Sequence, residues 1–101
     1  MSRLRWSRRA TEDLLAIGDF IAADDAKAAR RWVSRLRAAA RVAARSPGVG
    51  RRVPELERDD VRETFLRTYR IVYRILGRDV VVLTVIEGHR QLRGVSADDT
   101  V

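Results

Sequence analysis

The sequence predicts an α+β domain: a two-helix hairpin packed on a mainly antiparallel sheet of about four strands, in the order β-α-α-β-β-β. Three observations support this fold class. Residues 8–22 and 26–45 carry apolar side chains at helical spacing. Residues 68–75 place Tyr and Ile on one face and Arg and Val on the other, as in a half-buried strand. Residues 80–86 are β-branched and apolar almost throughout, which is typical of a central strand covered on both faces.

The N-terminal elements follow from local signals. Residues 4–6 are expected to form a short strand. Ser7 can then cap a helix of about residues 8–22, because its hydroxyl can accept a hydrogen bond from an unpaired backbone N–H. The apolar stripe of this helix consists of Leu14, Ile17, Phe20 and Ile21.

The second helix is expected over about residues 26–45, with Asp24 or Asp25 as its cap. Ser46, Pro47 and Gly48 end it. The connection between the helices is short, so they should pack as an antiparallel hairpin. The apolar stripe of the second helix consists of Ala29, Trp32, Val33, Leu36, Ala40 and Ala43.

An irregular connector is expected over residues 49–60, and three strands joined by two tight turns over residues 61–90. In the middle strand, Tyr69, Ile71, Tyr73 and Ile75 should face the core, whereas Arg70, Val72 and Arg74 should face the other way. Gly77 can supply the positive φ that the turn before the last strand needs.

Length and composition bound the function. The 101 residues predict one domain, residues 1–93, with residues 94–101 as a flexible tail. The chain has no cysteine, which excludes disulfides and thiolate chemistry and fits a reducing cytoplasm. No apolar run reaches membrane length, so no membrane association is expected. A single histidine and no clustered carboxylates give no expected metal site, and no cofactor is expected.

The charge indicates an anionic partner. The net charge is +7, and 20 of the 21 basic residues are arginine. Arginine suits planar contacts with phosphate or carboxylate, although codon bias in a GC-rich genome would also explain why arginine replaces lysine.

Three segments of the chain are distinctive when taken together: WSRRATEDLLAIGDFIA, AARRWVSRLRAAARVAARSPGVGRRVPEL, and VRETFLRTYRIVYRI with the later VVVLTVIEGHR. They resemble the RelE/ParE toxin superfamily, and its ParE branch in particular. The repeated YRI and the final V-x-x-x-H-R, residues 85–90, are the most specific signals. The resemblance covers about residues 4–92.

This resemblance implies the toxin of a type II toxin–antitoxin module, of the kind that stabilises plasmids. Toxins of the ParE branch poison DNA gyrase and are neutralised by a ParD-like antitoxin in a hetero-oligomer such as a heterotetramer. The same scaffold also hosts ribosome-dependent mRNA endonucleases of the RelE type, so that activity is the alternative.

The residues for RNA cleavage are scarce. His89 is the single histidine, Tyr69 and Tyr73 are expected to face the core, and Lys27 is far from the strands in sequence. Arginine is a poor proton shuttle, because its pKa is above 12. The sequence therefore predicts a protein poison with no catalytic residues rather than an enzyme.

Candidate target-binding residues, from the resemblance and the pattern of charge, are Arg62, Arg70, Arg74, His89 and Arg90. Two simpler interpretations remain open. The strand arginines can pair across strands with Glu63 or Glu87, and His89 can hydrogen-bond locally at the end of the strand. If Arg70 binds the target, Arg70→Ala should reduce toxicity and leave the fold intact.

Candidate antitoxin-binding residues lie on the first helix. The resemblance implies that an antitoxin tail adds a helix in an apolar groove and a strand at a sheet edge. Leu15 lies off the main stripe and suits an exposed second face. The candidates are Leu14, Leu15, Phe20 and Ile21.

Overall fold

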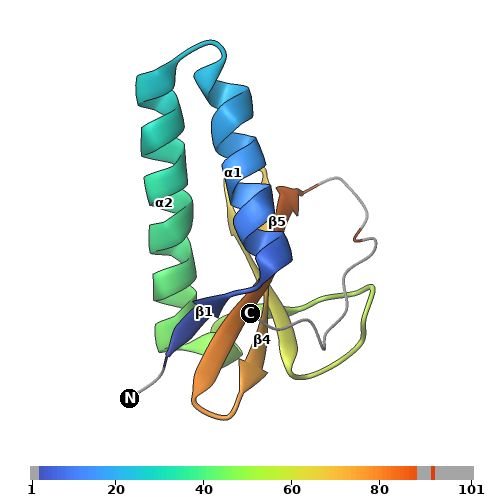
Figure 1. Ribbon diagram of the computed structural model, residues 1–101. Coiled ribbons are helices and arrows are strands. Elements are labelled where there is room, and N and C mark those ends of the chain that lie inside the picture. The colour runs from blue at the N-terminus through green and yellow to red at the C-terminus, as the bar shows by residue number, and fades with distance from the viewer. Residues whose placement is uncertain (1–2, 89–91, 93–101) are drawn as a thin grey trace.

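Two helices lie side by side against one face of a mixed sheet in a computed structural model of the chain, which describes residues 3–88 and 92 (Figure 1). The elements are, in order, β1 (Leu4–Trp6), α1 (Arg8–Ala22), α2 (Ala26–Arg45), the short 3₁₀ helix η1 (Pro47–Val49), β2 (Arg51–Arg52), β3 (Val61–Leu66), β4 (Tyr69–Leu76) and β5 (Asp79–Glu87). The predicted fold class is confirmed.

The sheet has five strands in the order β1-β5-β4-β3-β2. β1 runs parallel to β5, and every other neighbouring pair is antiparallel. The connector expected to be irregular contains β2, whose two residues pair with Arg62 and Glu63 of β3. A strand of two residues is too short to show a period in the sequence, which is why it was missed.

Local capping fixes both helices. Ser7 accepts a hydrogen bond from the backbone N–H of Ala10, and Asp25 accepts one from Ala28, each at 3.0 Å. Both helices begin and end where the sequence predicted. No helix in the described part of the chain is long and apolar enough to cross a bilayer.

Both faces of the sheet carry a core. On the helix side, side chains of α1 and α2 pack on the sheet around Leu14, Leu36, Ile71, Val82 and Val85. The opposite face has a smaller cluster of Val53, Val61, Val72, Val81 and Leu83, with Leu56 and Leu92 against it. The connector between β2 and β3 therefore covers the face that the helices leave open.

A β-bulge in β5 allows both cores to form. Val72 pairs with Thr84, whereas Tyr73 pairs with Val82, so Leu83 is the extra residue. The shift brings Val82 and Val85, three residues apart, into the same helix-side cluster. After the bulge, the side chains of β5 alternate between the two faces of the sheet in the opposite phase.

The N-terminal half of α1 binds this bulge. The Ser7 hydroxyl donates to the Leu83 carbonyl at 3.0 Å. The Asp13 carboxylate accepts hydrogen bonds from the Thr84 hydroxyl and, at 3.2 Å, from the Val85 backbone N–H. Two backbone groups of β5 at and beside the bulge thus find partners at the start of α1.

The end of α2 is tied to the sheet by Tyr73. Its side chain is 1% exposed, and its hydroxyl donates to the Pro47 carbonyl at 2.8 Å. The ring passes close to Gly50, where an added Cβ would lie 2.9 Å from Tyr73 Cζ and closer still to the hydroxyl. Only glycine leaves room for the tyrosine here.

Gly50→Ala should therefore lower the free energy of unfolding by about 1–3 kcal/mol, because the new methyl group forces Tyr73 out of place. Gly48→Ala is the matched control, since nothing lies within 4 Å of a Cβ at that position. Urea unfolding measures both. Equal stability of the two variants would contradict the close approach.

Candidate functional site

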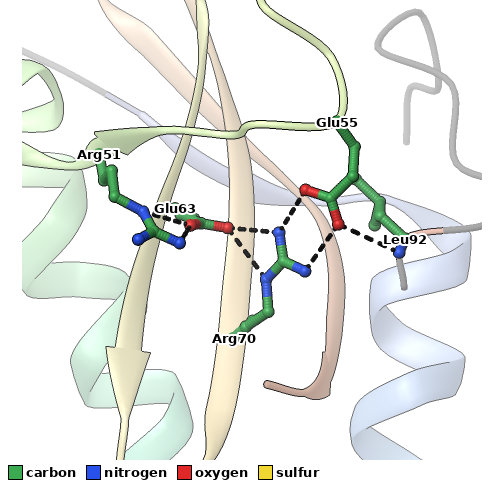
Figure 2. A network of polar contacts seen from close by, with 5 residues as sticks. All are labelled: Arg51, Glu55, Glu63, Arg70 and Leu92. Atoms are coloured by element: carbon green, nitrogen blue, oxygen red, sulfur yellow. Dashed lines mark hydrogen bonds and ion pairs between the residues drawn. The ribbon is translucent and has the colours of Figure 1, made fainter. Parts of the chain in front are cut away.

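A chain of ion pairs with a buried centre crosses the face of the sheet opposite the helices (Figure 2). Glu63 on β3 and Arg70 on β4 form its centre. The Arg70 Nε and Nη2 atoms lie 2.9 and 2.5 Å from Glu63 Oε1. The side chain of Glu63 is 0% exposed and that of Arg70 is 6% exposed. The carboxylate also accepts hydrogen bonds from Arg51 on β2, through its other oxygen.

The chain of pairs continues to the connector. Arg70 donates to both carboxylate oxygens of Glu55, at 2.9 and 3.0 Å. These hydrogen bonds lower the pKa of Glu55 from 4.5 to about 2, and the same contacts raise the pKa of Arg70 above its ordinary value. Glu55 also accepts a hydrogen bond from the backbone N–H of Leu92 at 3.4 Å. Arg70 therefore links β3, β4, the connector and the chain after β5.

The predicted target-binding arginines do not share one surface. Val61 and Glu63 lie on the same face as Arg70 and Arg74, whereas Arg62 faces the helices beside Tyr73. The Arg62 guanidinium donates to the carbonyls of Gly50, Asp59 and Gly48, at 2.9, 2.8 and 3.2 Å.

Arg74 also has an internal partner. Its Nε lies 3.1 Å from Asp60 Oδ2. Arg58 and Arg74 both donate to Asp60, with the Arg58 contact the stronger, and lower the pKa of that carboxyl. His89 and Arg90, the other two candidates, lie outside the described residues. The role of this set as a target-binding surface stays a prediction.

The ion pairs of Arg70 bear on the expectation that Arg70→Ala leaves the fold intact, while its role in target binding stays a prediction. A side chain that is 6% exposed offers a target little surface, and the alternative of a cross-strand pair with Glu63 is the contact seen. The sequence pattern did not indicate Glu55, Arg51 and Arg58 as partners of these residues. The arginine-rich strand signalled that acidic partners were needed, but partners in the connector cannot be assigned without the tertiary structure.

The candidate antitoxin residues divide between core and surface. Leu14 is 3% exposed and packs in the helix-side core, so it offers a partner little surface, and its part in antitoxin binding stays a prediction. Ile21 is partly buried. Leu15 and Phe20 are 61% and 80% exposed, but they lie about 140° apart around the helix, on different flanks.

A groove lies beside Phe20. Its lining comes from the flank of α1 and from the ends of β4 and β5: Arg9, Asp13, Ala16, Ile17, Phe20, Tyr69, Val85, Ile86 and Glu87. β1 pairs only with Val80, Val81 and Val82, so the outer edge of β5 beyond Val82 has no neighbouring strand among the described residues. An exposed aromatic ring, a groove and an open edge therefore lie together.

Groups that could move a proton near the sheet are few in the described part of the chain. Burial raises the pKa of Tyr73 and of Tyr69 above the ordinary value of 10.0, so both stay protonated near neutral pH. Lys27 lies on α2. No three His, Asp or Glu side chains gather as metal ligands among residues 3–88 and 92.

The architecture is that of a small α+β protein with a two-helix hairpin on one face of its sheet and a network of ion pairs on the other. The family model described as "ParE toxin of type II toxin-antitoxin system, parDE" matches residues 4–92. The chain belongs to this ParE toxin family.

Two known proteins are similar to this one. "Putative toxin Y4kP" of Sinorhizobium fredii is 41% identical over 93 residues, which cover 88% of this chain and 91% of that protein. A solved structure titled "Chromosomal ParDE TA system from P. aeruginosa" has a TM-score of 0.72 and covers 86% of this chain and 96% of that one. Its identity is 23%, so this likeness shows the fold alone.

Arg70→Ala should lower the free energy of unfolding by about 3–5 kcal/mol, because it removes one partner of a buried carboxylate. Arg78→Ala, at an exposed turn position, is the control and should change stability by less than about 0.5 kcal/mol. Urea unfolding measures both. Wild-type stability of Arg70→Ala would contradict a structural role for the pair.

The Glu55 contact predicts a dependence on pH. The folded-state pKa of Glu55 is lowered from 4.5 to about 2, so its stabilisation is complete above about pH 4.5 and is lost as the pH falls towards 2. Across this range Glu55→Gln should lose less stability than the wild type. Glu57→Gln, whose carboxylate is in none of the described ion pairs, should lose as much as the wild type. Parallel curves for wild type and Glu55→Gln would contradict the contact.

Proposed function

We propose that this protein is a ParE-type toxin that poisons DNA gyrase and is neutralised by a ParD-like antitoxin. Membership of the ParE toxin family over residues 4–92 carries the proposal. The resemblance to the ParE branch implies that gyrase is the target. Action on an intracellular enzyme fits a cytoplasmic protein without disulfides.

The side chains of the sheet support a poison over a nuclease. Cleavage of RNA through its 2′-hydroxyl needs a base, an acid and cations for the developing charge. Arg70 and Arg74 already neutralise internal carboxylates, and Tyr73 already donates to a backbone carbonyl. Because these side chains make contacts that stabilise the fold, few side chains on the described sheet are available for proton transfer.

The antitoxin surface that the geometry favours is the groove beside Phe20. Tyr69, Val85 and Ile86 give it an apolar floor, and the open edge of β5 adjoins it. A helix can bury its apolar face in such a groove, and an extended segment can pair with such an edge. Phe20 is the side chain most available to a partner there.

Expression of the full chain without an antitoxin should arrest growth and induce the DNA-damage response. In vitro, gyrase, supercoiled plasmid and the purified chain should accumulate cleaved DNA, because a poison stabilises the cleaved intermediate. Messenger RNA on translating ribosomes should stay intact. Codon-positioned mRNA cuts with unaffected gyrase would instead establish the RelE-type alternative.

Phe20→Ser should weaken binding of the antitoxin encoded beside the toxin by about tenfold or more, because it removes an exposed aromatic anchor. The free energy of unfolding should change by less than about 0.5 kcal/mol. Val49→Ser is the matched control, since Val49 is 85% exposed and lines a different groove, at the end of α2. Titration calorimetry gives both affinities. Loss of affinity in the Val49 variant alone would place the antitoxin elsewhere.

A further inference from the structure

The positive charge of the chain is concentrated in one continuous stretch. Residues 26–54 contain nine basic residues and no acidic residue, whereas the rest of the chain contains 12 basic and 14 acidic residues. Codon bias can explain arginine in place of lysine, but it does not explain the absence of acids from this stretch. The whole net charge of +7 therefore arises from α2 and the segment that follows it.

The basic residues of α2 form an unneutralised surface, here called the α2 basic face. None of them takes part in the ion pairs of the described chain. At 1.5 Å per residue, the face extends about 27 Å along the helix. Its members, all exposed, are Lys27, Arg30, Arg31, Arg35, Arg37, Arg41 and Arg45.

Two tryptophans position the flanks of this face. The Arg35 guanidinium lies 5.7 Å from the centre of the Trp32 ring, and that of Arg37 lies 5.8 Å from the Trp6 ring. Cation–π contact holds these two cations beside the helix. Each indole therefore already carries a guanidinium on one face.

We propose that the α2 basic face binds the phosphate backbone of duplex DNA. A row of cations without acids on a rigid helix neutralises phosphates and releases their counterions. An α-helix is about 10–12 Å wide with its side chains, which matches the roughly 12 Å major groove of B-form DNA. This activity goes beyond the proposed function, because it requires neither gyrase nor an antitoxin.

Other anionic partners fit the α2 basic face less well. A polypeptide partner needs apolar anchors, and Val42 is the one large apolar side chain that α2 exposes. Single strands are held by stacking on aromatic rings, and guanidiniums lie over Trp6 and Trp32. The narrow major groove of A-form RNA does not admit a helix.

The test is fluorescence anisotropy of the full chain with a labelled duplex of arbitrary sequence, about 20 base pairs long, at several salt concentrations. The logarithm of the association constant should fall linearly with the logarithm of salt, with a slope between about −4 and −6 if five to seven phosphates are contacted. The duplex should bind at least about tenfold more tightly than oligo(dT), duplex RNA or a polyglutamate peptide.

Matched variants assign the binding to α2. R30Q/R31Q/R41Q removes three charges from the face and should make the slope shallower by about 3, with affinity at least about a hundredfold lower near 0.1 M salt. R3Q/R8Q/R78Q removes three exposed charges elsewhere and should lose less than about tenfold. R30K/R31K/R41K keeps the charges and should keep the slope.

Three results would overturn the proposal. The first is that the chain does not bind the duplex at about 0.05 M salt. The second is that the two glutamine variants lose the same affinity for the duplex. The third is that RNA or polyglutamate binds more tightly than DNA. Circular dichroism checks that each variant folds. If R30Q/R31Q/R41Q does not fold, the single charge reversal Arg31→Glu tests the proposal instead. It should weaken DNA binding more than Arg78→Glu does.

Discussion

The buried pair between Arg70 and Glu63 is the interaction on which the second face of the sheet depends. A charge removed from water costs several kcal/mol unless a partner satisfies it, so neither residue could occupy this position alone. Arg51 and Glu55 complete the set and bring β2 and the connector onto the sheet. Through its Glu55 carboxylate, the same network also reaches the backbone N–H of Leu92. The pair therefore connects β2, β3, β4 and the connector on the face of the sheet that the helices do not cover.

The bulge at Leu83 has a comparable effect on the other side of the sheet. A central strand with a regular alternation would have sent Val82 and Val85 to opposite faces. With one residue added, both pack in the helix-side core, and Ser7 and Asp13 bind the Leu83 carbonyl and the Val85 N–H. The packing of the helical hairpin on the sheet therefore depends on the bulge in β5.

Arginine has two different roles in this protein. On β3 and β4, the guanidiniums of Arg62, Arg70 and Arg74 donate to carboxylates and carbonyls of the same chain, and they hold the fold together. On α2, guanidiniums face solvent without a carboxylate, and they are available for a partner. The net charge of the whole chain indicated an anionic partner, and the sequence placed the candidate contacts with it on strand arginines and on His89 and Arg90. The geometry instead favours the helix as the surface that meets one.

The sequence by itself determined the fold class and the bounds of both helices, because caps such as Ser7 and Asp25 and the 3.6-residue period act within a few neighbouring residues. The tertiary structure decided the parallel pairing of β1, the two-residue strand β2, the bulge, and which arginines are internal. These depend on register and on contacts between distant segments, such as that of Arg70 with Glu55, 15 residues apart. Alternation within one strand gives the two faces, but only the neighbouring strands and the connector determine what covers each face.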